Sequence, residues 1–225
     1  MAGAASGTDR IRRWYHDGVN HPESKSDRRD LRAVFLDSDG VINEKMPEGS
    51  YVRTAAELKV LDGAAEAIAR LNRAGLRAIV VSNQRGIALG LYTADDVRAI
   101  QATIEYQIAD HHAHLDGFYF CPHDKGECNC RKPLPGLFEQ AVADFPEISA
   151  ATSVMIGDSL SDIEFGRRLG MRTIFIKGDP ARRRPDAERA DELADERFNS
   201  LAEAVDFLLK DRADPEGTGS APKSA

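Results

Sequence analysis

Four short polar segments carry side chains that could act together on a phosphate ester. They are Asp37-Ser38-Asp39-Gly40, Ser82-Asn83, Arg131-Lys132 and Gly157-Asp158. A carboxylate that attacks a phosphate dianion meets like-charge repulsion on the order of several kcal/mol in a partly dry site. A hard divalent cation bound to both groups removes this repulsion, and Mg²⁺ prefers oxygen ligands of this kind. The residue types therefore predict metal-assisted transfer of a phosphoryl group to an aspartate.

The carboxylates divide this chemistry among them. Asp37 and Asp158 can supply oxygen ligands to Mg²⁺ from the ends of two apolar runs. Asp39 can protonate the leaving alkoxide and then deprotonate the water that hydrolyses an aspartyl-phosphate. Taken alone, Asp39-Gly40 is a turn signal and Asp158 is a helix cap. The order of the four segments favours the catalytic interpretation.

The remaining polar residues could neutralise or hold the phosphoryl group. Lys132 can place its ammonium against both the attacking carboxylate and the phosphate. Ser82 and Asn83 can hold phosphoryl oxygens with backbone N–H groups at the end of a strand. The simpler alternatives are a surface lysine before Pro133 and a strand end with polar caps.

The cysteines indicate a second metal site. All three, Cys121, Cys128 and Cys130, lie within ten residues of one another, and His123 lies between them. Three thiolates and one imidazole complete a closed tetrahedral site, which predicts a structural Zn²⁺. The alternative is a set of buried thiols beside a surface histidine. A second histidine group, His111, His112 and His114, is interpreted as an ordinary helix end.

The elements that must position these residues alternate along the chain. Apolar runs predict strands at 33–37, 76–83, 117–121, 153–157 and 172–177. Helical spacing and capping signals predict helices at 63–74, 93–112, 135–145, 162–169 and 201–209. This alternation predicts an α/β fold with a parallel sheet covered by helices on both faces. Ligands of such sheets bind at the carboxyl ends of the strands, where the polar segments lie.

Composition narrows the class of protein. Of 225 residues, 42% are apolar and 30% are charged, which excludes a wholly disordered chain or a disulfide-stapled miniprotein. The net charge of −7 argues against nucleic-acid and anionic-membrane partners, and the Arg182–Arg184 run is interpreted as a solvated loop. With no secretory signal or apolar span, we expect a cytoplasmic monomer. Residues 31–210 form the expected domain, between a flexible extension (1–30) and a disordered tail (211–225).

The motifs DSDG, SNQ, RKP and GDSLSD, in this order, resemble those of the haloacid dehalogenase (HAD) phosphatase superfamily over residues 31–180. The resemblance implies a Rossmann-like sheet, Mg²⁺ and an aspartyl-phosphate intermediate. By motif position, Asp37 would be the nucleophile and Asp39 the acid and base. Asp37, the main-chain carbonyl of Asp39 and Asp158 would hold the metal. Asp162 would support the site from behind.

The Cys/His segment is similar to the zinc loop of small-cap HAD phosphatases, the D,D-heptose 1,7-bisphosphate and histidinol-phosphate phosphatases. The segments RKPLPG and SNQRGIALGLYT resemble the heptose enzymes more closely. This implies a small sugar bisphosphate cleaved at its 7-phosphate, with Arg131 on the second phosphate. About 30 residues separate Gly90 from the zinc loop, too few for a large cap. The alternatives are a histidinol-phosphate phosphatase, a DNA 3′-phosphatase and a catalytically silent zinc-binding interaction module.

Overall fold

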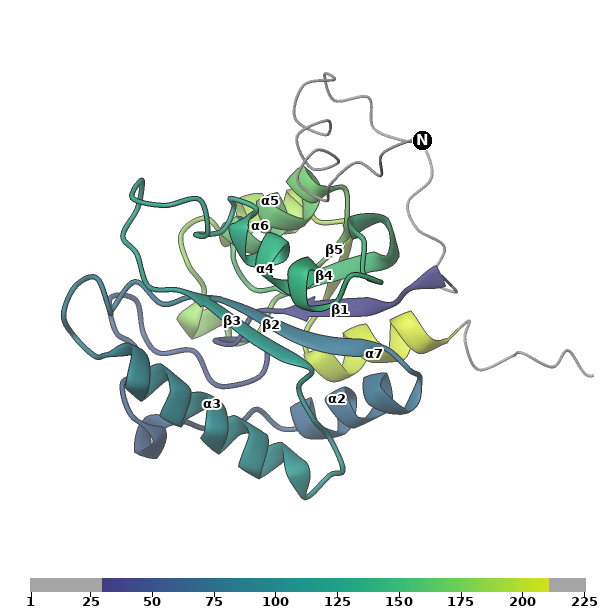
Figure 1. Cartoon of the computed structure of the whole chain (residues 1–225), viewed down its shortest axis with the longest axis horizontal. Coiled ribbons are helices and arrows are strands. Elements are labelled where there is room, and N and C mark those ends of the chain that lie inside the picture. Colours follow the sequence, from purple (N-terminus) through teal and green to yellow (C-terminus); the bar gives the residue numbers. More distant parts are fainter. Residues whose placement is uncertain (1–29, 211–225) are drawn as a thin grey trace, which may run out of the picture.

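The protein forms one parallel sheet between two layers of helices (Figure 1). The computed structural model describes residues 30–210; nearly all of the predicted extension and the whole predicted tail lie outside these residues. The strands are β1 (Ala33–Leu36), β2 (Arg77–Asn83), β3 (Gly117–Cys121), β4 (Ser153–Gly157), β5 (Arg172–Ile176) and β6 (Glu196–Phe198). Their order across the sheet is β3-β2-β1-β4-β5-β6, and every neighbouring pair is parallel.

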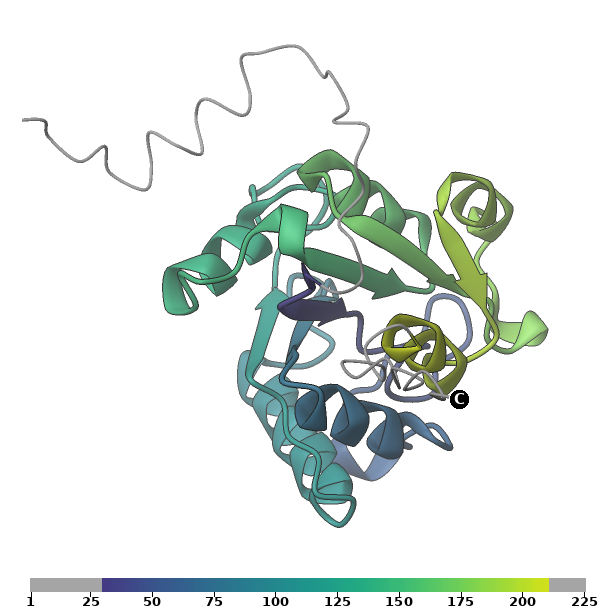
Figure 2. The same cartoon turned by 90° about the vertical axis from the view of Figure 1, so that its right-hand side faces the viewer.

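Helices cover both faces of the sheet, as the sequence predicts. One layer consists of α2 (Ala64–Arg73), α3 (Ala94–Ala109) and α7 (Leu201–Leu209). The other consists of α4 (Gly136–Asp144), α5 (Leu160–Leu169) and α6 (Ala187–Leu193). Figure 2 shows the same two layers after a quarter turn. Within residues 30–210, no helix combines the length and apolar character needed to cross a bilayer.

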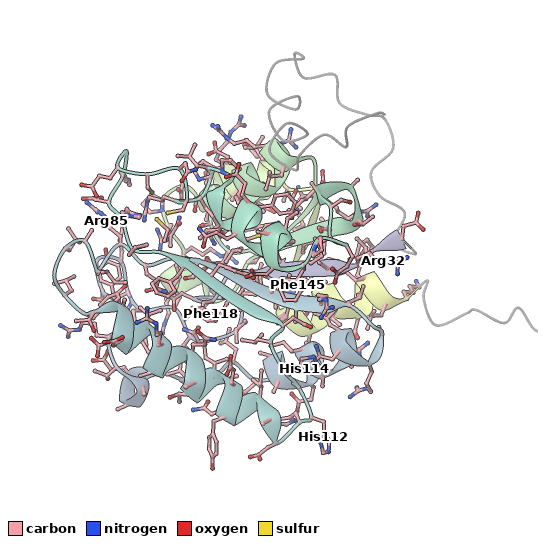
Figure 3. All side chains as sticks on the ribbon, viewed as in Figure 1. Arg32, Arg85, His112, His114, Phe118 and Phe145 are labelled. Atoms are coloured by element: carbon pink, nitrogen blue, oxygen red, sulfur yellow. The ribbon has the colours of Figure 1, made fainter. Side chains whose placement is uncertain are left out.

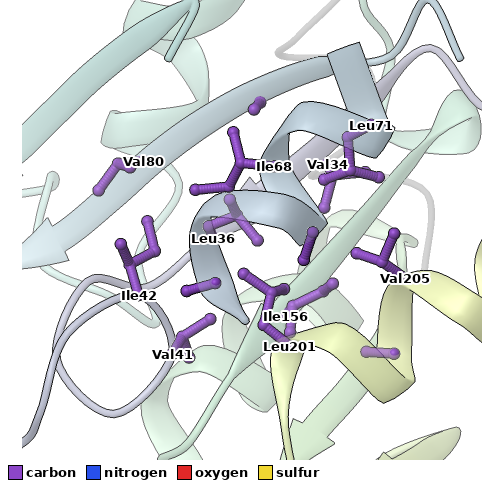
Figure 4. Close-up of a cluster of buried hydrophobic side chains, with 14 of the residues drawn as sticks. Val34, Leu36, Val41, Ile42, Ile68, Leu71, Val80, Ile156, Leu201 and Val205 are labelled. Atoms are coloured by element: carbon purple, nitrogen blue, oxygen red, sulfur yellow. The ribbon is translucent and has the colours of Figure 1, made fainter. Parts of the chain in front are cut away.

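The central strand β1 explains why the strands appear as unbroken apolar runs. Its residues have no exposed surface, because each face of the sheet packs against helices. Val34 and Leu36 point into the cluster shared with α2 and α7, which Figure 4 shows. Ala33 and Phe35 point into the opposite cluster, where the Phe35 ring centroid lies 5.5 Å from that of Phe138.

Two elements, α6 and β6, are absent from the predicted set of five strands and five helices. The buried face of α6 consists of alanines, and β6 has three residues. Neither offers the run of large apolar side chains from which the other elements are predicted. α6 packs its Ala187 and Ala190 against Ile163 and Phe175, so tertiary contacts define it.

Candidate active site

The carboxyl ends of β1, β2 and β4 bring the predicted polar segments to one edge of the sheet. Asp37 directly follows β1, and Asp158 directly follows the neighbouring strand β4. Lys132 reaches the same place from the loop between β3 and α4, with its Nζ 3.0 Å from Asp37 Oδ1. Segments that are far apart in the chain therefore share one polar cluster.

Lys132 is the buried cation at the centre of this cluster, with 2% of its surface exposed. Its Nζ lies 2.6 Å from Asp162 Oδ1 and donates to the Val81 carbonyl at 2.6 Å. With Asp37 included, Lys132 therefore contacts two carboxylates and one carbonyl oxygen. Burial opposes the charged lysine, but Asp162 and Asp37 outweigh it and raise the pKa of Lys132.

Asp162 holds the lysine from the first turn of α5. Its second oxygen accepts hydrogen bonds from the Ser159 backbone N–H at 3.0 Å and the Ser159 hydroxyl at 2.6 Å. Burial disfavours its charged form, but Lys132 outweighs this effect and the pKa of Asp162 is lowered. A Cβ on Gly157 would lie 2.2 Å from Asp162 Cβ, so this approach requires a glycine. Asp162 thus supports the cluster from behind, with both oxygens engaged.

The other three carboxylates have raised pKa values. Burial, followed by repulsion from Asp162, raises the pKa of Asp37 to about 7. Burial raises the pKa of Asp158 to about 6, although Lys45 acts in the opposite direction. Burial also raises the pKa of Asp39. Oxygens of Asp37, Asp158 and Asp162 all lie within 4.8 Å of one another, a spacing that suits a hard divalent cation.

The turn after β1 fixes Asp39 and leaves room for Asp158. Asn43 donates to Asp39 Oδ1 at 2.7 Å and accepts from the Ser38 hydroxyl at 2.8 Å. Gly40 has a φ of +88°, and a Cβ there would lie 2.1 Å from Asp158 Oδ2. Asp39-Gly40 is therefore both a turn, as its sequence indicates, and a part of the acidic site, because the turn leaves space for Asp158.

The two polar residues at the end of β2, Ser82 and Asn83, have different hydrogen-bonding roles. The Asn83 side chain accepts from the Lys132 backbone N–H at 2.9 Å and donates to the Lys132 carbonyl at 3.1 Å, so it fixes the lysine segment. Ser82 is buried and its Oγ accepts from Gln84 at 2.9 Å, which leaves the hydroxyl proton to donate. Gln84 in turn accepts from Tyr92 at 2.7 Å. Tyr92 lies in the segment SNQRGIALGLYT, but sequence reasoning assigns it no role.

A second lysine reaches the carboxylates from a segment without regular structure. Lys45 Nζ lies 2.5 Å from Asp158 Oδ2, and both side chains are about nine-tenths buried. The Lys45 carbonyl accepts from Arg182 at 2.6 Å. Beside this pair lies a cavity of about 320 Å³, which Gly40, Lys45 and Asp158 help to line. Sequence reasoning missed Lys45, because its partner is 113 residues away.

The predicted zinc ligands are brought together by the loop after β3. The Sγ atoms of Cys121 and Cys128 are 3.5 Å apart, and His123 Nδ1 lies 3.7 Å from Cys121 Sγ and 3.3 Å from Cys130 Sγ. A tetrahedral zinc with Zn–S bonds of about 2.3 Å separates its ligand atoms by about 3.5–3.8 Å. Burial and the neighbouring thiols raise the pKa of Cys130, a cost that a bound cation would remove. The four donors fit zinc.

Arg131 links the Cys/His loop to the acidic cluster. Its backbone N–H donates to Cys128 Sγ at 3.4 Å, and its side chain is half-buried. One terminal guanidinium nitrogen is buried and makes no hydrogen bond to the described residues. A neighbouring arginine, Arg85, instead pairs with Asp124 through both oxygens, at 2.6 and 3.1 Å. This nitrogen could therefore donate a hydrogen bond to an anion.

The histidines near the end of α3 lie away from this site. Figure 3 shows His112 and His114 toward the lower edge of the molecule, well away from Arg85, which lies at the upper left and contacts the Cys/His loop. His111 Nδ1 lies 3.1 Å from Glu66, and His114 lies 3.9 Å from Asp116. This placement agrees with their interpretation as an ordinary helix end.

Comparisons with known proteins agree with this architecture. A family model described as HAD-hydrolase-like matches residues 129–204. The D-glycero-beta-D-manno-heptose-1,7-bisphosphate 7-phosphatase of Vibrio cholerae is 35% identical, covering 79% of this chain and 96% of that protein. The D-glycero-alpha-D-manno-heptose-1,7-bisphosphate 7-phosphatase of Mycobacterium tuberculosis is 39% identical, and the match covers 60% of this chain and 72% of that protein. A crystal structure of D,D-heptose 1,7-bisphosphate phosphatase from B. bronchiseptica, complexed with magnesium and phosphate, superposes with a TM-score of 0.70. Its sequence is 26% identical, and the match covers 80% of this chain and 99% of that chain.

Proposed function

The chain belongs to the HAD-like phosphatases, in the family of the heptose-1,7-bisphosphate 7-phosphatases, and we propose that it hydrolyses the 7-phosphate of D-glycero-D-manno-heptose 1,7-bisphosphate. The observation that carries the proposal is the contact of the buried Lys132 with Asp37 and Asp162, beside Asp158. This cluster pairs a candidate nucleophile with a fixed cation and a second carboxylate.

The reaction has two steps. An Asp37 oxygen attacks phosphorus, and the bond from phosphorus to the sugar oxygen breaks. Asp39 gives its proton to that oxygen; the pKa of Asp39, raised by burial, suits a group that must begin protonated. Asp39 then takes a proton from water as the water oxygen attacks phosphorus; the bond between phosphorus and the Asp37 oxygen breaks, which releases inorganic phosphate and restores the Asp37 carboxylate. Lys132 keeps its charge against Asp37 throughout.

We propose Mg²⁺ as the cation of this site and Zn²⁺ as a structural ion of the Cys/His loop. Asp37, Asp158 and the main-chain carbonyl of Asp39 would hold Mg²⁺, which supplies charge neutralisation between the carboxylate and the phosphate. Cys121, Cys128, Cys130 and His123 would hold Zn²⁺. Closed tetrahedral coordination leaves no position for substrate, so the zinc would stabilise the folded loop and take no direct part in bond breaking.

The phosphoryl group and the second phosphate are assigned to different residues. We propose that Ser82 and the backbone at Asn83 hold the transferred phosphoryl oxygens, while Arg131 binds the second phosphate with its unpartnered guanidinium nitrogen. Arg131→Met should raise KM for a bisphosphate by about tenfold or more, since a charged hydrogen bond is lost. Its kcat/KM for a monophosphate should change little.

A substrate panel tests the function. Phosphate release should be fastest from heptose 1,7-bisphosphate, measured for both anomers, and slow from histidinol phosphate and from a 3′-phosphorylated DNA end. A preference for histidinol phosphate would overturn the substrate assignment. Release from none of them, with Asp37→Asn indistinguishable from the unmodified chain, would favour the silent zinc-binding module.

A further inference from the structure

Lys45 occupies a position that the proposed reaction does not explain. Its Nζ lies 2.5 Å from Asp158 Oδ2, and their side chains are 10% and 11% exposed. Lys132 already pairs with Asp37 and Asp162, so Lys45 is a second ammonium in the acidic cluster, on a different carboxylate. A buried ammonium on a candidate cation ligand competes with that cation, because both are positive and both need the same carboxylate.

The backbone of Lys45 is anchored on both sides, so only its side chain is free to turn. Arg182 donates to the Lys45 carbonyl at 2.6 Å, and the neighbouring Glu44 backbone N–H donates to the Lys59 carbonyl at 2.8 Å. The four-carbon stem of a lysine can redirect its charge while the main chain stays in place. The cavity of about 320 Å³ beside Asp158 provides space for this rotation.

A phosphoryl dianion is the group that can receive the displaced ammonium. It must lie within bonding distance of Asp37, and oxygens of Asp37 and Asp158 lie within 4.8 Å of each other. The ammonium can therefore exchange a carboxylate oxygen for a phosphoryl oxygen with a small movement. Such an exchange keeps Lys45 paired and leaves Asp158 to the divalent cation.

We propose that Lys45 is a substrate ligand which alternates between Asp158 and the phosphoryl group, and thereby makes divalent cation and phosphate bind cooperatively. The inference rests on the proposed phosphatase function and extends it to a residue outside the HAD motifs found in the sequence. Anion binding draws Lys45 from Asp158 and strengthens cation binding; by linkage, the cation strengthens anion binding to the same degree.

Calorimetric titration of the full chain tests this directly, with MgCl₂ as the cation and inorganic phosphate as the anion. Lys45→Met retains length but removes charge, and Lys45→Arg retains charge. The matched control is Lys59→Met, because Lys59 lines the same cavity but is itself exposed and pairs with Glu44 instead of Asp158. Mg²⁺ affinity is measured for each protein with and without phosphate.

In the absence of phosphate, Lys45→Met should bind Mg²⁺ at least about fivefold more tightly than the unmodified chain does. Phosphate should strengthen Mg²⁺ binding in both proteins, but the strengthening factor should be at least about fivefold smaller in Lys45→Met. Lys45→Arg and Lys59→Met should behave like the unmodified chain. Affinities of Lys45→Met within about twofold of the unmodified chain would overturn the inference, as would equal effects of Lys59→Met. An unmodified chain that binds no Mg²⁺ would overturn the proposed function as well, so the two failures are distinguishable.

Discussion

Replacing Asp162 with asparagine is the sharpest test of the buried ion pair. The substitution preserves shape but removes the charge that faces Lys132 Nζ at 2.6 Å, and both side chains are almost fully buried. The asparagine also cannot satisfy both of its neighbours. One carboxylate oxygen faces the lysine and the other accepts from the Ser159 backbone N–H, so either orientation of the amide sets its NH₂ group against a donor.

The magnitude follows from the geometry. Two unit charges at this separation interact by about 6 kcal/mol at an effective dielectric constant of about 20. Lys132 keeps Asp37 at 3.0 Å, which offsets part of the loss. Breaking a buried pair from one side typically costs about 3–5 kcal/mol, which corresponds to a fall in Tm of about 6–20 °C for a domain of this size.

Chemical and thermal unfolding of the full chain, followed by circular dichroism, measures this loss. The folded-state pKa of Asp162 is lowered, so its contribution to stability is present above the unfolded value of about 3.9 and is lost as pH falls through the folded pKa. The difference between Asp162→Asn and the unmodified chain should therefore be constant near neutral pH and shrink below about pH 4.

Two comparisons make the result interpretable. Asp206→Asn removes an exposed carboxylate that pairs with Arg70, and should cost about 0–1 kcal/mol. Adding Lys132→Met to Asp162→Asn removes both buried charges and should restore part of the stability lost in the single variant. A loss below about 1 kcal/mol for Asp162→Asn, equal to that of the exposed control, would refute the reasoning.

Three further substitutions test other parts of the site. Asp37→Asn should reduce phosphate release by about a thousandfold or more while the fold and the zinc content are retained, and turnover near the original rate would exclude Asp37 as the nucleophile. Gly40→Ala forces a Cβ to within 2.1 Å of Asp158 Oδ2 at a φ of +88°, so it should cost about 1–3 kcal/mol and weaken Mg²⁺ binding in calorimetry; unaltered Mg²⁺ affinity would contradict this. Cys128→Ser should lower zinc content and Tm, by metal analysis and calorimetry, whereas unchanged values would show that the cluster binds no zinc.

The sequence predicts most of the sheet for one physical reason. Strands buried on both faces appear as continuous apolar runs, and the polar residues that end those runs must meet at one edge. Burial and strand direction are therefore enough to predict that Asp37 and Asp158 lie close together. The same argument misses β6, whose three residues form no such run and whose position depends on pairing with β5.

The position of a site residue is predictable when it directly follows a strand, and less so when it belongs to a loop or an irregular segment. Lys45 and Tyr92 belong to irregular segments. The tertiary fold brings Lys45 to Asp158, whereas the loop between β2 and α3 turns Tyr92 back onto Gln84. Asn83 shows a different difficulty. Its position is predicted, but a hydrogen-bond inventory is needed to see that its side chain holds the backbone of Lys132.

The Cys/His loop leads directly into two positively charged residues, Arg131 and Lys132, and this has a practical consequence. Cys130 is followed at once by Arg131 and Lys132, and Cys128 Sγ accepts from the Arg131 backbone. The conformation of the Cys/His loop therefore determines the backbone positions of both positively charged residues. A chelator that removes the proposed zinc should therefore loosen the backbone that carries Arg131 and Lys132, and the protein should lose affinity for its substrate even when Mg²⁺ is supplied again.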